Sequence, residues 1–116
     1  LQQSDFITIQ IPFSNETQTL IGKEELSLMK KTAYIISTSR PEIIDQQALG
    51  KVLQKKQIAG AALDDIHFPD PTLAALPNVI LTPHIGFYTR EALIRKGDIG
   101  VGNVEAFVVE KPQNTV

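Results

Sequence analysis

The sequence predicts an α/β fold in which a parallel sheet with flanking helices is followed by a long helix. Two observations predict it. Short apolar segments alternate with amphipathic segments along most of the chain, which is the order of strands and crossover helices in a parallel sheet. Polar residues follow the ends of the apolar segments, where ligand crevices open in such folds. With 116 residues, the chain is long enough for one hydrophobic core.

The first predicted elements are a strand and a short helix. Phe6 to Ile11 alternates bulky and polar residues and stops at Pro12, which has no backbone donor, so we expect a strand there. Residues 22–29 predict a short helix, because Leu26 and Met29 are three positions apart and share a face.

The middle of the chain continues the same alternation. Tyr34 to Ile36 is continuously apolar, as expected of a parallel strand covered on both faces. A helix is predicted from about Asp45 to Lys55, and a strand of small apolar residues from Ile58 to Leu63. The inward-facing residues of that helix are predicted to be Leu49, Val52 and Leu53.

The last third combines a loop, a strand and a helix. The segment from His67 to Pro77 contains three prolines and predicts a loop with fixed turns. Val79 to Leu81 predicts a strand, and a long helix is expected from about Thr89 to Val109. The glycines within that helix each cost about 1 kcal/mol relative to alanine, so they indicate tight packing or a bend. They are Gly97, Gly100 and Gly102.

Composition excludes several classes of function. The 11 Lys and Arg against 13 Asp and Glu give a net charge of −2, too balanced for an electrostatic nucleic-acid or membrane surface. The chain has no cysteine, which excludes disulfides and cysteine nucleophiles and fits a cytoplasmic location. With two histidines and no cysteine, we expect no metal site.

Three polar sites follow three different apolar strands: Arg40, the Asp64 to Asp70 segment, and His84. Carboxyl ends of parallel strands lie at one edge of a sheet, so these residues can converge on one crevice. Arginine offers a planar pair of donors for a carboxylate or carbonyl oxygen. Histidine, with an ordinary pKa near ~6.5, exchanges protons at neutral pH, and a nearby carboxylate raises that pKa. Pro83 fixes the backbone before the histidine, and Gly86 allows close approach after it.

The same residues also fit ordinary structural roles. Arg40 could be a surface charge, Asp70 a turn former between prolines, and His84 a loop side chain that bonds a carbonyl group. His67 has no partner at metal-ligand spacing, and we assign it only to a solvated loop.

Four linked motifs run in order along nearly the whole chain. They lie in residues 4–22, 29–45, 59–64 and 77–84, and include Ile35-Ile36-Ser37-Thr38-Ser39-Arg40 and Thr82-Pro83-His84. On these motifs the sequence resembles the D-isomer specific 2-hydroxyacid dehydrogenase family. The triplet Phe87-Tyr88-Thr89 is most similar to its D-lactate and D-hydroxyisocaproate dehydrogenase branch.

The resemblance implies roles for named residues. Arg40 would bind the substrate, His84 would donate the proton, and Asp70 would stand where the family has its glutamate beside the histidine. Asp70 is one methylene shorter than glutamate and one residue further from Asp64 than usual. Tyr88 would help to bind the substrate. The implied contacts to NAD are Pro12, Thr38, Ser39, Arg40, Asp64, His84 and Gly86. Three further positions depart from the family pattern: Gln10, Ser37 and Pro41.

The resemblance also implies a domain plan. Residues 1–88 would be the C-terminal half of a Rossmann-like NAD-binding domain, and residues 89–116 a helix and tail that return toward a substrate domain. No Gly-x-Gly-x-x-Gly turn follows any predicted strand, and the chain opens on Leu1, so we interpret it as a fragment that is inactive alone. The choice between NAD and NADP stays open, because the deciding acidic residue follows an earlier strand.

The implied function is hydride transfer between NAD(H) and a small 2-oxoacid or D-2-hydroxyacid, by a cytoplasmic homodimer. Two alternatives remain. One is an NADH-sensing module of the same fold that binds partner proteins without turnover. The other is a relative that acts on formate or phosphite.

Overall fold

A computed structural model describes residues 1–64 and 71–114 of the chain. The chain divides into two compact units, Leu1–Ile85 and Gly86–Val116. Two residues discussed above, His67 and Asp70, lie outside the described residues.

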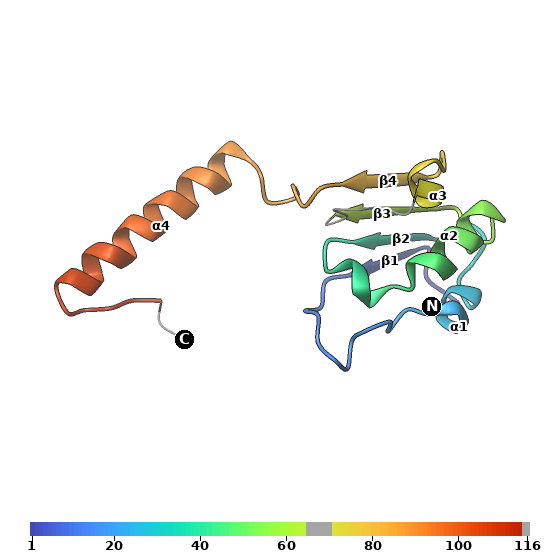
Figure 1. The fold of residues 1–116 in the computed structure, drawn as a ribbon, viewed down its shortest axis with the longest axis horizontal. Helices are drawn as coiled ribbons and strands as arrows, with labels where there is room; N and C mark the ends of the chain where they lie inside the picture. The colour runs from blue at the N-terminus through green and yellow to red at the C-terminus, as the bar shows by residue number, and fades with distance from the viewer. Residues whose placement is uncertain (65–70, 115–116) are drawn as a thin grey trace. The chain divides into compact units, whose positions relative to one another are not determined.

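The first unit is built on a four-stranded parallel sheet with the strand order β1-β2-β3-β4. The strands are β1 (Phe6–Ile9), β2 (Tyr34–Ser37), β3 (Gly60–Asp64) and β4 (Val79–Thr82). All four point toward the same edge of the sheet (Figure 1). The predicted parallel α/β architecture is therefore confirmed.

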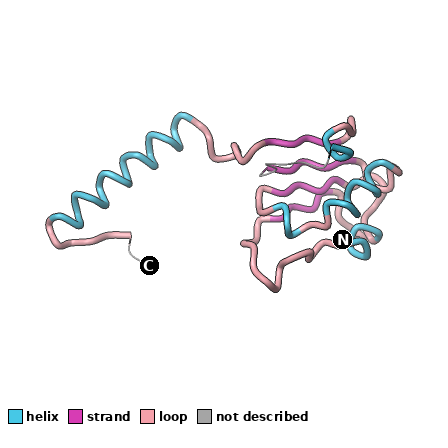
Figure 2. Tube along the Cα trace, viewed as in Figure 1, coloured by secondary structure: helices cyan, strands magenta, loops and turns pink. Residues whose placement is uncertain are grey.

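Short helices connect the strands (Figure 2). They are α1 (Lys23–Ser27), the 3-10 helix η1 (Pro41–Ile43), α2 (Gln46–Gln54) and α3 (Pro71–Ala74). The start of α2 is set by Asp45, whose side chain accepts a hydrogen bond of 2.9 Å from the Ala48 amide. At the start of α1, the Gly22 amide donates to Glu25 Oε2 at 3.0 Å.

The hydrophobic core lies between these helices and one face of the sheet. Ile35 of β2, Ile43 of η1 and Leu49 of α2 are all 0% exposed. The predicted inward residues of α2 are buried, and so are Leu26 and Met29. Strand residues that join the same cluster are Ile7, Ile9, Ala61, Leu63, Val79 and Leu81. One layer of helices thus covers one face.

The opposite face of the sheet is bare among the described residues of Leu1–Ile85. Phe6 is 65% exposed and Ile80 66% exposed, while Tyr34 is 45% exposed. The rings of Phe6 and Tyr34 stack with centroids 5.7 Å apart. Together with Ile36 and Ala62, these side chains line a broad hollow of about 740 Å³. Our expectation that Tyr34 to Ile36 is covered on both faces is therefore wrong within this part of the chain.

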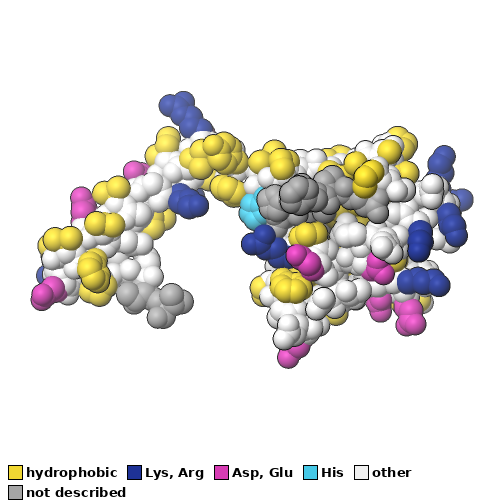
Figure 3. Space-filling model, viewed as in Figure 1, with side chains coloured by type: hydrophobic (Ala, Val, Ile, Leu, Met, Phe, Trp, Pro, Cys, Tyr) yellow, Lys and Arg dark blue, Asp and Glu magenta, His cyan; other side chains and the backbone are white. Residues whose placement is uncertain are grey.

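The second unit consists mainly of α4 (Arg90–Val108). It begins after Thr89, whose Oγ1 accepts a hydrogen bond of 3.1 Å from the Ala92 amide. No residue of α4 is buried, and a Cβ added at Gly97 or Gly100 would meet no atom within 4 Å. Tight packing of these glycines is thus not found here. Apolar side chains are exposed along the helix (Figure 3), among them Ile94, Val101, Val104, Phe107 and Val108.

Some element boundaries differ from the predicted ones. The first strand ends at Ile9 rather than Ile11, because Ile9 pairs with Ser37, the last residue of β2. The third strand begins at Gly60 rather than Ile58. The predicted loop from His67 to Pro77 contains α3, which begins at a proline. None of the described helices is both long and apolar enough to cross a lipid bilayer.

Candidate functional site

The carboxyl ends of the four strands are aligned at one edge of the sheet, and the segments that follow β1, β2 and β4 leave from this edge (Figure 1). Ser37 at the end of β2 pairs with Leu63, and Asp64 at the end of β3 pairs with Thr82 of β4. Since β2 and β4 flank a single strand, their ends are about 10 Å apart. Arg40 follows the end of β2 closely, and His84 follows the end of β4. The two turns therefore share this carboxyl edge.

Serine side chains hold the turn after β2 in place. Ser37 is 4% exposed, and its Oγ accepts a hydrogen bond of 3.3 Å from the Ser39 amide. Ser39 Oγ donates to the Ile11 carbonyl at 2.5 Å, which ties this turn to the segment after β1. Thr38 and Arg40 are exposed. The serines fix the backbone, while the two exposed side chains remain within reach of a ligand.

The Asp64 carboxylate holds the turn after β4. Asp64 Oδ1 accepts a hydrogen bond of 2.5 Å from Thr82 Oγ1 and one of 2.9 Å from the Ile85 amide. His84, between these two donors, is exposed and has a φ of 56°, in the left-handed region. The turn that carries the histidine is thus tied to the end of β3.

The structure locates only some of the remaining predicted site residues at the carboxyl edge. Pro12 follows β1 at the carboxyl edge, and its carbonyl accepts a hydrogen bond of 3.0 Å from Thr17 Oγ1. Gly86 and Tyr88 belong to the second unit; Tyr88 is 64% exposed, and its ring meets Phe87 edge to face at 5.8 Å. Asp70 lies outside the described residues. The residues brought to one edge are Pro12, Thr38, Ser39, Arg40, Asp64 and His84.

Three polar residues at this edge were given no site role from the sequence. Thr82 bonds Asp64, and Ser37 orients the β2 turn. Gln46 lines a narrow crevice with Ser37 and Asp64, and its Nε2 donates to the Pro41 carbonyl at 2.9 Å. Thr82 carried a local signal, because it lies directly before Pro83 and His84, whereas its bond to Asp64 depends on the register between β3 and β4. Gln46 carried none.

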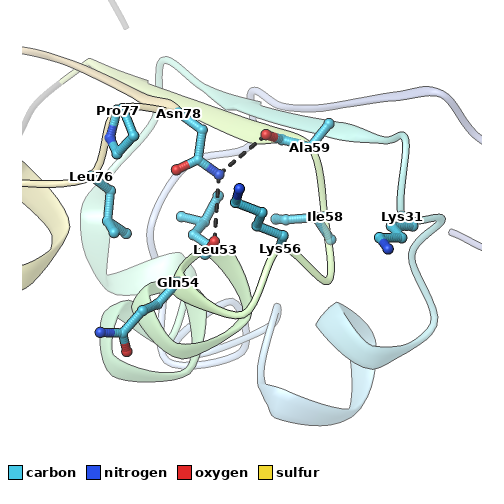
Figure 4. A pocket seen from close by; sticks show the side chains of 9 residues that line it. All are labelled: Lys31, Leu53, Gln54, Lys56, Ile58, Ala59, Leu76, Pro77 and Asn78. Carbon is cyan, nitrogen blue, oxygen red and sulfur yellow. Dashed lines mark hydrogen bonds between the residues drawn. The ribbon is translucent and has the colours of Figure 1, made fainter.

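Another cavity lies at the opposite, amino edge of the sheet (Figure 4). Its volume is about 400 Å³, and it is lined by Lys31, Leu53, Gln54, Lys56, Ile58, Ala59, Leu76, Pro77 and Asn78. Asn78 Nδ2 donates to the Ala59 carbonyl at 3.2 Å and to the Leu53 carbonyl at 3.5 Å. These bonds tie α2 to the starts of β3 and β4. We assign this cavity to the packing of the amino edge, because the candidate site residues follow the other ends of the strands.

Residues 1–86 match the NAD binding domain of the D-isomer specific 2-hydroxyacid dehydrogenases. The chain belongs to this family. The family predicted from the motifs is thus confirmed, and so is NAD as its cofactor.

Individual relatives support the same assignment over the whole chain. Glycerate dehydrogenase of Methylorubrum extorquens is 41% identical over all of this chain, which spans 39% of that protein. Glyoxylate reductase of Aeropyrum pernix is 42% identical, again over all of this chain and 36% of that protein. The NAD-complexed D-isomer specific 2-hydroxyacid dehydrogenase of Lactobacillus delbrueckii ssp. bulgaricus superimposes with a TM-score of 0.91 at 32% identity, over 100% of this chain and 40% of that one.

The chain spans less than half the length of the curated relatives it matches. Their names differ in substrate, so membership in the family does not select one 2-hydroxyacid. Among residues 1–64 and 71–114, no three His, Cys, Asp or Glu side chains lie close enough together to bind a metal ion.

Proposed function

We propose that the protein containing this chain interconverts a small 2-oxoacid and its D-2-hydroxyacid. The observation that carries this proposal is the common carboxyl edge from which the Arg40 and His84 turns leave the sheet of an NAD-binding domain. NADH, when bound, supplies the hydride. The chain's own residues would bind the substrate and move the proton.

The residues at this edge suit the nicotinamide end of the cofactor. A carboxamide both donates and accepts hydrogen bonds, and the Asp64 carboxylate and the Thr38 hydroxyl offer the matching groups. Thr38 directly follows β2, and Asp64 is the last residue of the neighbouring strand β3. Dinucleotides bind at these carboxyl ends of the strands in α/β folds. No glycine-rich turn is present in the sequence, so we assign no residue to the pyrophosphate.

The substrate chemistry is divided between two side chains. Arg40 would pair with the substrate carboxylate through its planar guanidinium and polarise the 2-oxo group. His84 would give a proton to the carbonyl oxygen as the hydride reaches the carbon, and take it back in the reverse reaction. Asp70 would be the acidic partner of His84, and Tyr88 would contribute to the substrate pocket.

The domain plan and assembly are part of the same proposal. Residues 1–88 would be the C-terminal half of the NAD-binding domain, and residues 89–116 would lead toward a substrate domain. The coverage of the relatives, 36% and 39% of their lengths, supports a longer polypeptide. We propose that this protein is a homodimer in the cytoplasm; the absence of cysteine fits a reducing compartment and does not bear on the dimer.

Kinetics of Arg40→Lys and His84→Gln in the full-length protein test the proposal. Lysine keeps the charge but not the bidentate geometry, and glutamine cannot act as an acid, so each should lower kcat/KM by roughly 10² to 10⁴. Arg95→Lys, on exposed α4, and His67→Gln are matched controls that should stay near the wild-type value.

The choice of assay separates the alternatives. The panel should contain several 2-oxoacids, including glyoxylate, together with formate and phosphite. Near-normal turnover in either variant would remove that residue from its role. Cofactor-dependent binding of a partner protein without turnover of any 2-oxoacid would replace the enzyme with a sensing module.

A further inference from the structure

The geometry points to a positioning role for Asp64 and Thr82: together they hold the turn that sets His84. This inference rests on the proposed function of His84 as the proton donor. It adds Thr82, to which no role was assigned from the sequence, and it gives Asp64 a second role beside the proposed contact to the cofactor.

The backbone of the turn explains why it needs to be held. Pro83 has a fixed φ, and it keeps the residue before it extended, which suits Thr82 as the last residue of β4. His84 then has a φ of 56°. Proline followed by a residue with positive φ is the order of a type II turn, whose third position favours glycine. Histidine enters the left-handed region more readily than most residues, but its Cβ still makes it unfavourable.

Two hydrogen bonds to one atom bracket this unfavourable residue. Asp64 Oδ1 accepts from Thr82 Oγ1 at 2.5 Å and from the Ile85 amide at 2.9 Å. One donor lies before Pro83 and the other directly after His84. Bonds to an ionised carboxylate are stronger than those between neutral groups. Movement of the turn would strain both bonds at once, so the pair restricts the backbone on both sides of His84.

The pairing of the strands places the two partners. Asp64 and Thr82 are directly paired residues of the parallel strands β3 and β4. Their side chains therefore project from the same face of the sheet and stand next to each other. Because β3 and β4 are paired strands of the sheet, they provide a common anchor for a histidine that lies on an exposed turn.

Positioning of this kind has a defined kinetic effect. An acid works efficiently only within hydrogen-bond reach of the atom that it protonates. Loosening the turn should therefore slow the chemical step and leave the binding of NADH nearly unchanged. If the bond between Thr82 and Asp64 served folding alone, its loss would lower the stability of the protein, but it would not lower kcat while leaving the KM for NADH unchanged.

The test uses three variants of the full-length protein. Thr82→Val removes the hydroxyl donor and keeps the shape, Thr82→Ser keeps the donor, and Thr8→Val makes the same change at an exposed position of β1, at the other end of the strand order from β4. We expect Thr82→Val to lower kcat about tenfold with an NADH KM within twofold of wild type. Thr82→Ser should restore most of kcat, and Thr8→Val should behave as wild type.

A second measurement needs no activity. Hydrogen exchange of the Ile85 amide, followed by NMR with ¹⁵N-labelled isoleucine, should become about tenfold faster in Thr82→Val and not in Thr8→Val. If the wild-type protein turns over no 2-oxoacid, the proposed function fails while this exchange experiment still decides the positioning role. Unchanged Ile85 exchange in Thr82→Val overturns the inference, and so does a kcat within twofold of wild type in an active enzyme.

Discussion

The two faces of the sheet carry similar side chains but have different surroundings. On one face, Ile35 and Leu63 are buried beneath α1, η1 and α2. On the other, Phe6, Tyr34 and Ile80 are 45% to 66% exposed in the described structure. Both faces are apolar, so composition alone does not distinguish them. The difference shows which face this chain covers with its own helices.

The cause is the order of the strands. From β1 to β4, each strand is added beside the previous one in the same direction. Connections between parallel strands are right-handed in nearly all proteins, so successive crossovers in one direction place their helices on the same face. Parallel sheets are normally covered on both faces. The bare face therefore indicates that a second layer comes from outside residues 1–85, in agreement with the proposed longer polypeptide.

The largest expected effect comes from a matched pair of isoleucines on the two faces. Ile35→Ala, at a position with 0% exposure, should lower the free energy of unfolding of this chain by about 2 to 5 kcal/mol. Ile80→Ala, at 66% exposure, should cost less than about 1 kcal/mol. Urea unfolding of the 116-residue chain, followed by circular dichroism, measures both values.

The same pair in the full-length protein sharpens the comparison. If a second layer covers the bare face there, Ile80→Ala should cost about as much as Ile35→Ala. Equal and small effects of Ile80→Ala in the short chain and in the full-length protein would contradict a second layer over this part of the sheet.

How much of this could be predicted from the sequence depends on the range of the interactions. The strand Tyr34 to Ile36 and the helix from Asp45 were recognisable, because apolar runs and helix caps are local signals. The common edge of Arg40 and His84 followed from parallel topology alone. The helix α3 was missed, because prolines on either side of it indicated a loop.

The bonds of Asp64 could not be predicted in the same way. They depend on the register between β3 and β4, and a shift of one residue would place Thr82 on the other face of the sheet. The left-handed conformation of His84 likewise depends on a partner that is distant in sequence. Periodicity identified the strands that carry the site, but the hydrogen bonds that shape it are non-local.

An intermediate effect is expected at Gly60, which faces the bare side beneath Tyr34. A Cβ at this position would lie 2.8 Å from the Asn78 carbonyl oxygen and 3.0 Å from the Tyr34 ring. That carbonyl also accepts the Ala61 amide at 3.0 Å, so it cannot move without disturbing the start of the β3–β4 pairing. Gly60→Ala should therefore destabilise the chain by about 1 to 3 kcal/mol.

Two control variants show whether the new Cβ at position 60 is crowded by the Asn78 carbonyl or by the Tyr34 ring. Gly50→Ala in α2 meets nothing within 4 Å and should stabilise the chain by up to about 1 kcal/mol. Adding Tyr34→Ala to Gly60→Ala removes the ring but not the carbonyl, so it should not restore stability. Full recovery in that double variant would show that the Tyr34 ring alone excludes a side chain from this position.

The smallest effect on stability, and the most direct test of the bare face, is expected from Ile80→Lys. A charge on an exposed apolar surface should change the free energy of unfolding by no more than about 0.5 kcal/mol. It should, however, reduce self-association of the 116-residue chain, because exposed apolar faces of this size favour association.

Leu28→Lys, at a site 45% exposed after α1, is the control, since it lies away from this face. Sedimentation velocity over a range of concentrations compares the variants. Equal association of wild type and Ile80→Lys would mean that the bare face is not the contact, and Val104→Lys on exposed α4 would then be the next variant to compare.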